Sequence, residues 1–514
     1  MKRTIDGLRD ETFEILIIGG GITGAGVALD AALRGLRVGL IDKADFASGT
    51  SSASSKLVHG GLRYLEHGGL HLVYEALHER KLLLQNAPHL VHPLRFILPF
   101  TRDTRVPPWK WRAGLTLYDL LAGRSNLRRS RPLDVSSLRD EFPGLNHETL
   151  LGGAEYYDAQ MDDARLCVEV VRTAALHGAR VANYVEAIGF ERRDSHVSGV
   201  RALDRIGGGE FSIYARQILN AAGPWVDAVC RLAGDNEPAH LRPTKGVHAV
   251  APGRGLAAAF LLLHPSDGRV FFVIPWMGKT LLGTTDTECN ETPDDLTVSP
   301  PEIDYLLQGH NHYFSPPLGS NDVLGSFVGL RPLIRARPGE PSSLSREFRI
   351  FASSSGLVSV AGGKYTTYRR MAEVVTDELA RRLGKRRQCR TRDCRLDGAP
   401  PAAWESFKMS EQRRLAQAYK LAENSILHLI ERYGRQAESV VRYIEQDVTL
   451  ADRILPSEPD LRAELAYQRD HEMAIYPCDS LLRRTRLGLF QPALMAKSWD
   501  DWNGRSAIKA TNHQ

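Results

Sequence analysis

Three glycines near the N-terminus have the spacing of a turn that binds a dinucleotide. Gly19, Gly21 and Gly24 form a G-x-G-x-x-G motif, and Asp42 follows the last glycine by eighteen residues. In such a motif the first glycine permits a tight turn, the second lets a pyrophosphate approach the backbone, and the third lets a helix pack on a strand. The later carboxylate accepts hydrogen bonds from ribose hydroxyls. The motif indicates a dinucleotide site but does not separate NAD from FAD.

The elements predicted around these glycines form one unit of strand, turn, helix and strand. Residues 15–18 are apolar and predict a buried strand, and residues 25–33 predict a helix with small residues toward the sheet. Because a helix N-terminus carries unpaired amides and the positive end of the dipole, we expect the phosphates there. A purely structural glycine turn is the alternative. The strand, the helix and the acid together argue against it.

Composition indicates a globular protein of two or three domains. The sequence has 514 residues, is 43% hydrophobic and carries a net charge of +5, and domains usually have ~100–200 residues. This mild charge gives no reason to expect nucleic acid binding, but it suits an anionic substrate or an anionic membrane surface.

Targeting and metal-binding signals are missing from the sequence. Residues 1–12 are polar and lack the apolar core of a signal peptide, and no apolar run approaches the ~18–20 residues of a spanning helix. We therefore expect a cytoplasmic protein with only peripheral membrane contact. The six cysteines form no C-x-x-C pair and no Cys/His quartet, so we expect no metal site and no iron–sulfur cluster.

The sequence changes character along the chain after the dinucleotide unit. Residues 43–61 form a long loop rich in serine and glycine, and such loops usually carry function. Short strands separated by glycine and proline predict an antiparallel sheet over residues 247–282. Residues 356–383 again indicate a strand, a glycine turn and a helix. A helix-rich, strongly charged region follows Pro400 and Pro401.

Six short segments in a fixed order together resemble one enzyme family. They are SSASSKLVHGGLRYLEHG (51–68), NAAGPWV (220–226), FVIPW to LLGTTDTE (272–288), GLRPL (329–333), GGKYTTYRRMAE (362–373) and ELAYQRDHEMAIYPCDSLLRRTRLG (464–488). In this order the chain resembles the membrane-associated, FAD-dependent glycerol-3-phosphate dehydrogenases over nearly its whole length.

The resemblance implies an α/β fold with three parts and a homodimer. The first is a G-x-G-x-x-G FAD-binding domain of the amino-acid-oxidase type, in residues 1–70, 151–240 and 330–388. The second is an inserted antiparallel-sheet substrate domain, in residues 71–150 and 241–329. The third is a C-terminal helical domain, residues 389–514.

The resemblance also implies FAD as the cofactor and a set of residues that bind it. Lys364 and Thr366 would place a helix N-terminus and a cation against the pyrimidine edge of the flavin. The alternatives are a solvated N-cap lysine, and serines in the 51–56 loop that only cap a helix. The implied FAD-binding residues are Gly19, Gly21, Gly24, Asp42, Ser51, Ser52, Ser55, Lys56, Gly60, Gly223, Gly363, Lys364 and Thr366.

Oxidation of a secondary alcohol that carries a phosphate also needs an anionic anchor. Arginine suits this role, because its planar fork gives phosphate two charged hydrogen bonds. By resemblance Arg63, Arg331 and Arg346 lie in the substrate pocket with Tyr64 and Lys364, and the alternative for Arg63 and Arg331 is a surface ion pair. The segment RARPGEPSS before Arg346 departs from the acidic spacing usual in the family.

The reaction further needs a group that accepts the hydroxyl proton. Imidazole titrates near neutral pH, and His248 matches a pocket histidine of the family. His59 is the competing base, and a structural histidine within a strand is the alternative for His248. With Arg331 and Lys364, these histidines make up the expected catalytic set.

One aromatic and basic segment indicates contact with a bilayer. Residues 106–123, VPPWKWRAGLTLYDLLAG, place tryptophans beside cations, as in the headgroup layer of a membrane. The alternative is a helix packed on the protein's own core. The resemblance implies that glycerol 3-phosphate is oxidised to dihydroxyacetone phosphate and that ubiquinone or menaquinone receives the electrons. The segment would hold the protein at the inner face of the membrane.

Four other functions stay open from the sequence. An oxidase would pass the electrons to oxygen, and a flavin amine or amino-acid oxidase would share the FAD loop. The anaerobic three-subunit enzyme should carry C-terminal cysteine clusters that this chain lacks. A flavin-binding protein without turnover would not need Arg63, Arg331 and Lys364.

Overall fold

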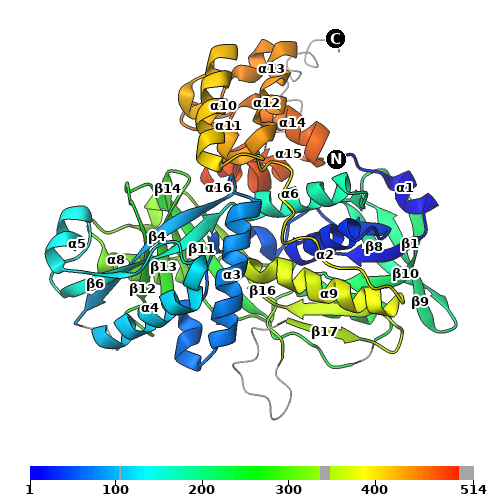
Figure 1. Cartoon of the computed structure of the whole chain (residues 1–514), viewed down its shortest axis with the longest axis horizontal. Helices are drawn as coiled ribbons and strands as arrows, with labels where there is room; N and C mark the ends of the chain where they lie inside the picture. The colour runs from blue at the N-terminus through cyan, green and yellow to red at the C-terminus, as the bar shows by residue number, and fades with distance from the viewer. Residues whose placement is uncertain (103–105, 236, 336–347, 497–514) are drawn as a thin grey trace, which may run out of the picture.

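Two sheet domains and a layer of helices above them make up the protein (Figure 1). The computed structural model describes residues 1–102, 106–235, 237–335 and 348–496. The first domain is built on an eight-stranded sheet, and the second on a ten-stranded sheet. The C-terminal domain, orange and red in Figure 1, lies above both.

Parallel strands form the centre of the first sheet. Its order is β17-β18-β10-β1-β2-β7, and neighbours from β18 to β7 are parallel. At one edge β17 is antiparallel to β18, and β8 and β9 extend from β10 as an antiparallel ribbon. The strands are β1 (Phe13–Ile18), β2 (Val38–Ile41), β7 (Arg180–Ala182), β8 (Val185–Arg193), β9 (His196–Asp204), β10 (Glu210–Asn220), β17 (Phe348–Ala352) and β18 (Val358–Gly362).

Both faces of β1 are buried, which explains why its residues are apolar at successive positions. Ile15 and Ile17 belong to a core shared with the helices, whereas Leu16 and Ile18 belong to a core shared with the β8–β9 ribbon. The helices of this domain are α1 (Ile5–Asp10), α2 (Ile22–Leu33), α6 (Asp163–Leu176), α7 (Val226–Leu232) and α9 (Tyr368–Arg382). The strand and helix predicted over 15–18 and 25–33 are therefore confirmed.

The second sheet is antiparallel apart from one parallel pair. Its order is β15-β11-β14-β13-β12-β4-β6-β3, with β16 beside β11 and β5 beside β6, and β12 is parallel to β4. The strands are β3 (Leu57–Val58), β4 (Val91–Thr101), β5 (Arg131–Leu133), β6 (Leu150–Met161), β11 (Thr244–Pro252), β12 (Ala259–Leu263), β13 (Val270–Trp276), β14 (Lys279–Gly283), β15 (Thr287–Glu288) and β16 (Gly325–Arg331). Residues 57–58 and 150–161 thus lie in this sheet, although the sequence analysis assigns 57–58 and most of β6 to the FAD-binding domain.

Helices cover both faces of the second sheet. One core contains Leu115 of α4 and Leu77 of α3, and the other contains Leu138 of α5 and Leu306 of α8. The helices are α3 (Leu70–Asn86), α4 (Pro108–Ala122), α5 (Val135–Glu141) and α8 (Pro300–Tyr313). Among the described residues, no helix is long and apolar enough to cross a bilayer.

The C-terminal domain is helical, as predicted. Its helices are α10 (Trp404–Ala418), α11 (Glu423–Tyr433), α12 (Ala437–Val441), α13 (Tyr443–Gln446), α14 (Arg462–Glu472), α15 (Pro477–Asp479) and α16 (Leu487–Phe490). Ile426, Leu429 and Tyr467 lie in a core of its own, whereas Leu481 and Leu487 pack into the second domain. The last helices therefore join the C-terminal domain to the sheets.

Close packing of α2 on β1 depends on Gly24. A Cβ atom at Gly24 would lie 1.9 Å from the carbonyl oxygen of Gly19, which has a φ of +111°. Gly21 is the N-cap of α2, and a Cβ there would meet the Ser51 hydroxyl at 3.1 Å. The third glycine is therefore required by the fold itself, and the second leaves space in front of the helix.

Replacing Gly24 with alanine should lower the free energy of unfolding by about 3 kcal/mol, because the methyl group would overlap backbone that moves only if α2 moves. Thermal unfolding measures this loss. Gly21→Ala is the matched control, and we expect it to change the free energy of unfolding by about 1 kcal/mol or less. Equal unfolding temperatures for the two variants would contradict this reading of the turn.

Candidate functional site

A large cavity opens where the first and second domains meet. Its volume is about 650 Å³. Residues from both sheets and from the loops between them line it. The predicted site residues on its wall are Gly19, Gly21, Asp42, Ser51, Ser55, His59, Gly223, His248, Arg331, Gly363, Lys364 and Thr366. Residues far apart in the sequence thus share one cavity.

The glycine turn and Asp42 form the end of the cavity that suits a ribose and a pyrophosphate. The Asp42 carboxylate accepts hydrogen bonds from the backbone amides of Gly20, at 2.7 Å, and Ala44, at 2.9 Å. Burial raises the pKa of Asp42 to about 6, although these amides oppose the shift. The group is still ionised at neutral pH and suits ribose hydroxyls. The open space before Gly21 and the N-terminus of α2 suit a pyrophosphate.

Residues 50–56, here called the serine loop, lie between this turn and the second sheet. Ser51 accepts a hydrogen bond from the amide of Ile22 at 2.9 Å, which ties the loop to the start of α2. Thr50 donates to the carbonyl of Leu330 at 2.6 Å, which ties it to β16. The loop is therefore held by both domains.

Lys56, expected to contact FAD, does not line the cavity but lies behind the serine loop. Its Nζ lies 2.8 Å and 2.9 Å from the two carboxylate oxygens of Asp163 and donates to the carbonyl of Ser52 at 2.6 Å. The side chain is fully buried and is absent from the cavity wall, and burial lowers the pKa of Lys56 to about 8. Lys56 therefore stabilises the serine loop from behind. Its partner Asp163 is 107 residues later, and no motif in the sequence indicated that the two residues pair.

His248 is a largely buried part of the cavity wall, and its Nε2 faces a serine hydroxyl. The residue is 2% exposed, its ring stacks on Phe327, and its Nε2 lies 2.9 Å from Ser55 Oγ. Its Nδ1 is buried without a hydrogen-bond partner among the described residues. Burial, with the nearby charges of Lys56 and Arg331, holds the pKa of His248 well below its ordinary value. The ring is neutral at physiological pH and can take up a proton through Nε2.

Arg331 projects from the end of β16 toward the same cavity. Its Nη2 donates to the Thr284 hydroxyl and the Thr285 carbonyl, both at 3.0 Å, and its Nη1 lies 3.1 Å from a carboxylate oxygen of Asp286. A Cβ at Gly246 on the neighbouring strand would lie 2.6 Å from Nη2. The guanidinium group is therefore held in one orientation, and its side chain stays 32% exposed.

Lys364 and Tyr64 meet at another side of the cavity. Lys364 precedes the 3₁₀ helix η7 (Tyr365–Thr367), which leads into α9, and its Nζ lies 3.6 Å from the centre of the Tyr64 ring. This is a cation–π contact. The amide of His59 donates to Thr366 Oγ1 at 3.2 Å, so the 59–64 segment and η7 are held together.

The other predicted residues either do not line the cavity or have side chains that the structure does not describe. Arg63 belongs to the 3₁₀ helix η2 (Leu62–His67), but its side chain is not among those described, and Arg346 lies outside the described residues. Gly60 donates to Tyr118 Oη at 2.9 Å. The predicted residues whose positions are described but that do not line the cavity are Gly24, Ser52, Lys56, Gly60 and Tyr64.

Several wall residues were missed by the sequence analysis. Trp225 donates from its indole nitrogen to Asp294 at 2.9 Å, and Lys43 binds the same carboxylate at 2.7 Å and 2.8 Å. These three side chains connect the first domain with a loop of the second. The tryptophan follows the NAAGP turn, but nothing in its own motif indicates a partner 69 residues away.

Family models match two parts of the chain. Residues 14–369 match the model described as FAD dependent oxidoreductase. Residues 389–500 match the model described as C-terminal domain of alpha-glycerophosphate oxidase. These matches confirm the α/β FAD-binding fold and the C-terminal domain that the sequence predicted.

Individual relatives extend the match over almost the whole chain. The aerobic glycerol-3-phosphate dehydrogenase of Staphylococcus saprophyticus is 36% identical over 491 residues, which cover 93% of this chain and 87% of that protein. The mitochondrial glycerol-3-phosphate dehydrogenase of Mesocricetus auratus is 38% identical over 499 residues, 92% of this chain and 67% of that protein.

A solved structure agrees with these relatives. The glycerol-3-phosphate dehydrogenase from Bacillus halodurans, in complex with FAD, superposes with a TM-score of 0.81 at 32% identity. The match covers 98% of this chain and 92% of that one. The fold, the glycine turn with Asp42 and these similarities agree on the cofactor, which is FAD. The chain belongs to the family of FAD-dependent glycerol-3-phosphate dehydrogenases.

Proposed function

We propose that the protein oxidises sn-glycerol 3-phosphate to dihydroxyacetone phosphate with FAD, and that a membrane quinone, ubiquinone or menaquinone, receives the electrons. The main support is that Arg331, Lys364 and the Ser55 partner of His248 line the cavity that also contains the glycine turn. The cavity thus combines cations for a phosphate with a proton-accepting pair. The names of the relatives agree with this substrate.

Arg331 and Lys364 are the proposed phosphate anchors. Bound FAD supplies the hydride acceptor. The contacts of Arg331 with Thr284 and Thr285 fix its guanidinium plane, so little conformational freedom is lost when it binds an anion. The Tyr64 ring likewise holds the Lys364 ammonium. Arg63 stays a proposed third anchor by resemblance.

Ser55 and His248 are the proposed route for the hydroxyl proton. The nitrogens of His248 do not open on the cavity: Nε2 faces Ser55 and Nδ1 is buried. We propose that Ser55 Oγ accepts the substrate proton while its own proton passes to His248 Nε2. His59, which lines the cavity, is the competing base. The lowered pKa of His248 keeps its ring neutral, so that Nε2 can accept the hydrogen bond of the Ser55 hydroxyl.

Anaerobic reduction of the bound FAD tests the function. We expect glycerol 3-phosphate to bleach the visible flavin spectrum, and glycerol and D-amino acids to leave it unchanged, since they lack the phosphate. Bleaching by a D-amino acid instead would indicate an amine oxidase. With oxygen admitted, stoichiometric peroxide would indicate an oxidase, whereas rapid reduction of ubiquinone or menaquinone analogues with little peroxide supports the proposed acceptor.

Arg331→Ala should weaken binding of glycerol 3-phosphate by ~2–5 kcal/mol, because a charge-assisted contact with the phosphate is lost. Glycerol, which lacks the phosphate, should leave the flavin spectrum unchanged in this variant as in the wild type. Stopped-flow titration of flavin reduction gives the apparent affinity. Arg242→Ala, which removes an exposed arginine that pairs with Glu288 away from the cavity wall, is the matched control. If Arg331→Ala keeps the wild-type apparent affinity for glycerol 3-phosphate, Arg331 does not bind the phosphate.

His248→Ala should slow flavin reduction by about 10²–10⁴-fold while FAD stays bound, the usual range for a general base. If Ser55 relays the proton, Ser55→Ala should slow the same step, and the double variant should be no slower than His248→Ala alone. Single-turnover kinetics measure all three. A normal rate of flavin reduction in His248→Ala would assign the general-base role to His59. If the losses of rate in the two single variants add up in the double variant, Ser55 and His248 do not share one proton relay.

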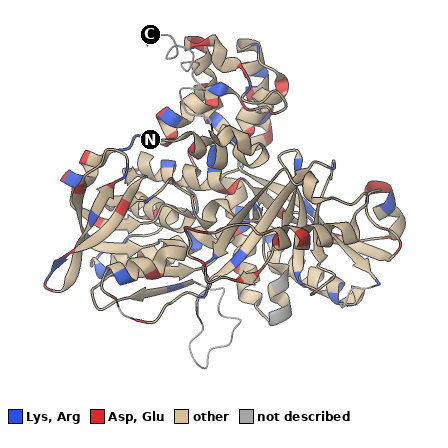
Figure 2. Cartoon of the chain, turned by 180° about the vertical axis from the view of Figure 1, so that it is seen from behind, with Lys and Arg blue, Asp and Glu red and all other residues tan. Residues whose placement is uncertain are grey.

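Helix α4 is the proposed membrane contact, and only one face of it is available. Trp109, Leu117 and Leu120 are exposed, with Trp109 at 70% and Leu120 at 73%. Trp111 and Leu115 are buried in the second domain. The buried face therefore agrees with packing on the protein's own core, and the exposed face is the one that we propose contacts a bilayer. Lys110 and Arg112 are exposed beside the apolar residues. Seen from behind, Lys or Arg and Asp or Glu positions are interspersed along the chain (Figure 2).

Changing Trp109, Leu117 and Leu120 together to serine should weaken sedimentation with anionic vesicles at least about tenfold, because their apolar area no longer enters the bilayer. Reduction of a soluble dye should be preserved. The matched control is Met409→Ser with Val448→Ser, two exposed apolar residues of the C-terminal domain. If the control variant loses vesicle binding and the α4 variant keeps it, the contact lies on the C-terminal domain.

A further inference from the structure

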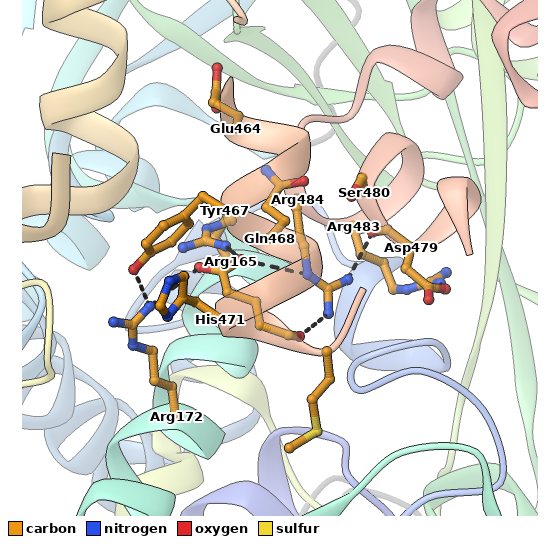
Figure 3. Close-up of polar contacts among 12 residues, drawn as sticks. Arg165, Arg172, Glu464, Tyr467, Gln468, His471, Asp479, Ser480, Arg483 and Arg484 are labelled. Atoms are coloured by element: carbon orange, nitrogen blue, oxygen red, sulfur yellow. Dashed lines mark hydrogen bonds and ion pairs between the residues drawn. The ribbon is translucent and has the colours of Figure 1, made fainter. Parts of the chain in front are cut away.

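Three arginines of the C-terminal domain are buried against acids of the first domain. Arg483, Arg484 and Arg486 stand within four consecutive positions, here called the arginine segment (483–486), and at most 9% of any of them is exposed. Figure 3 shows Arg483 and Arg484 beside Asp479, close to α14. So many buried charges need paired partners. The partners are acids at two points next to the FAD cavity, and neither acid lines its wall.

The first point is Asp45, three residues after the ribose carboxylate Asp42. Arg483 Nε donates to Asp45 at 2.6 Å, and Arg484 donates to it through Nη1 at 2.7 Å and Nη2 at 3.1 Å. Asp45 is completely buried. The loop after β2 is thus held by the C-terminal domain.

The second point is Asp163, the first residue of α6. Arg486 binds Asp163 and also Asp162, the latter at 2.9 Å. The same Asp163 carboxylate accepts bonds from the Ser54 hydroxyl at 2.7 Å and from Lys56 Nζ. One carboxylate therefore joins the arginine segment to the serine loop.

The serine loop links Asp163 to the proposed proton-accepting pair, Ser55 and His248. Ser54 and Lys56, both bound to Asp163, flank Ser55, and Ser55 Oγ lies 2.9 Å from His248 Nε2. Lys56 adopts a φ of +60°, which non-glycine residues rarely do, and it also binds the Ser52 carbonyl. The position of the Ser55 hydroxyl is thus set from both sides by contacts to one buried acid.

We propose that Arg486 is a positioning residue for flavin reduction, acting through Asp163 and Lys56 on Ser55, and that the C-terminal domain is thereby a part of the FAD site. The proposal rests on the proposed function above. If Arg486 is removed, the Asp162 and Asp163 carboxylates lose one of their cations, and Lys56 remains as the cation paired with Asp163. The serine loop then shifts against the flavin and His248. A displacement of about 1 Å is enough to cost about 10²-fold in rate.

Arg486→Met tests this, with Arg165→Met as the matched control. Arg165 is equally buried and joins the same two domains, through Glu472 at 2.5 Å, but none of its described hydrogen bonds or ion pairs reaches the serine loop. Each FAD-loaded variant is assayed for thermal unfolding, FAD retention on dilution, visible circular dichroism of the flavin, and single-turnover reduction by glycerol 3-phosphate.

We expect both variants to unfold at lower temperature. Only Arg486→Met should show an altered flavin dichroism, faster loss of FAD, and a reduction rate about 10²-fold lower at saturating substrate with little change in apparent substrate affinity. Arg486→Lys keeps the charge but lacks the planar guanidinium that binds Asp162 and Asp163 together, and its rate of flavin reduction should fall about tenfold. If Arg486→Met does not fold, the Lys variant decides.

A reduction rate and dichroism in the Arg486 variants equal to those of Arg165→Met would overturn the proposal, because Arg486 would then be an ordinary interface contact. If glycerol 3-phosphate fails to reduce the wild-type flavin, the proposed function fails instead. FAD retention and dichroism still decide whether Arg486 shapes the site.

Discussion

The buried carboxylate of Asp163 is the constraint on which the active site depends. It lies at the start of α6 in the first domain and binds Lys56 of the serine loop and Arg486 of the C-terminal domain. Burial raises its pKa, but the two cations more than offset this, so Asp163 stays ionised and its pKa lies below the ordinary value. A charge buried in this way is tolerated only while all its partners are in place. The three segments therefore depend on one another.

This dependence explains why the chain is not three independent units. Arg484 pairs with Asp45, and Arg165 pairs with Glu472, each across the border between the first and C-terminal domains. Breaking such a pair from one side leaves a buried charge without compensation, which typically costs 3–5 kcal/mol. We therefore infer that the C-terminal domain unfolds together with the FAD domain, and that its separation would expose unpaired acids beside the cofactor.

The sequence was informative wherever a function depends on neighbouring residues. The glycine turn, α2 and Asp42 fall within one short segment, so their spacing alone predicted the dinucleotide site. Lys56 shows the opposite case, because its partner is 107 residues away and its place in a serine-rich loop suggested a cofactor contact. The α4 segment shows a third case. Its composition is amphipathic, but only packing decides that Trp111 is buried while Trp109 is exposed.

The most direct test of the account is a crystal structure of the FAD-loaded protein with dihydroxyacetone phosphate. The account predicts that the phosphate contacts the Arg331 guanidinium and the Lys364 ammonium, with the carbonyl oxygen of this product within hydrogen-bond distance of Ser55 Oγ or His59. It also predicts that Lys56 still binds Asp163. A phosphate bound away from both cations, or a Lys56 that has left Asp163 to contact the flavin, would contradict it.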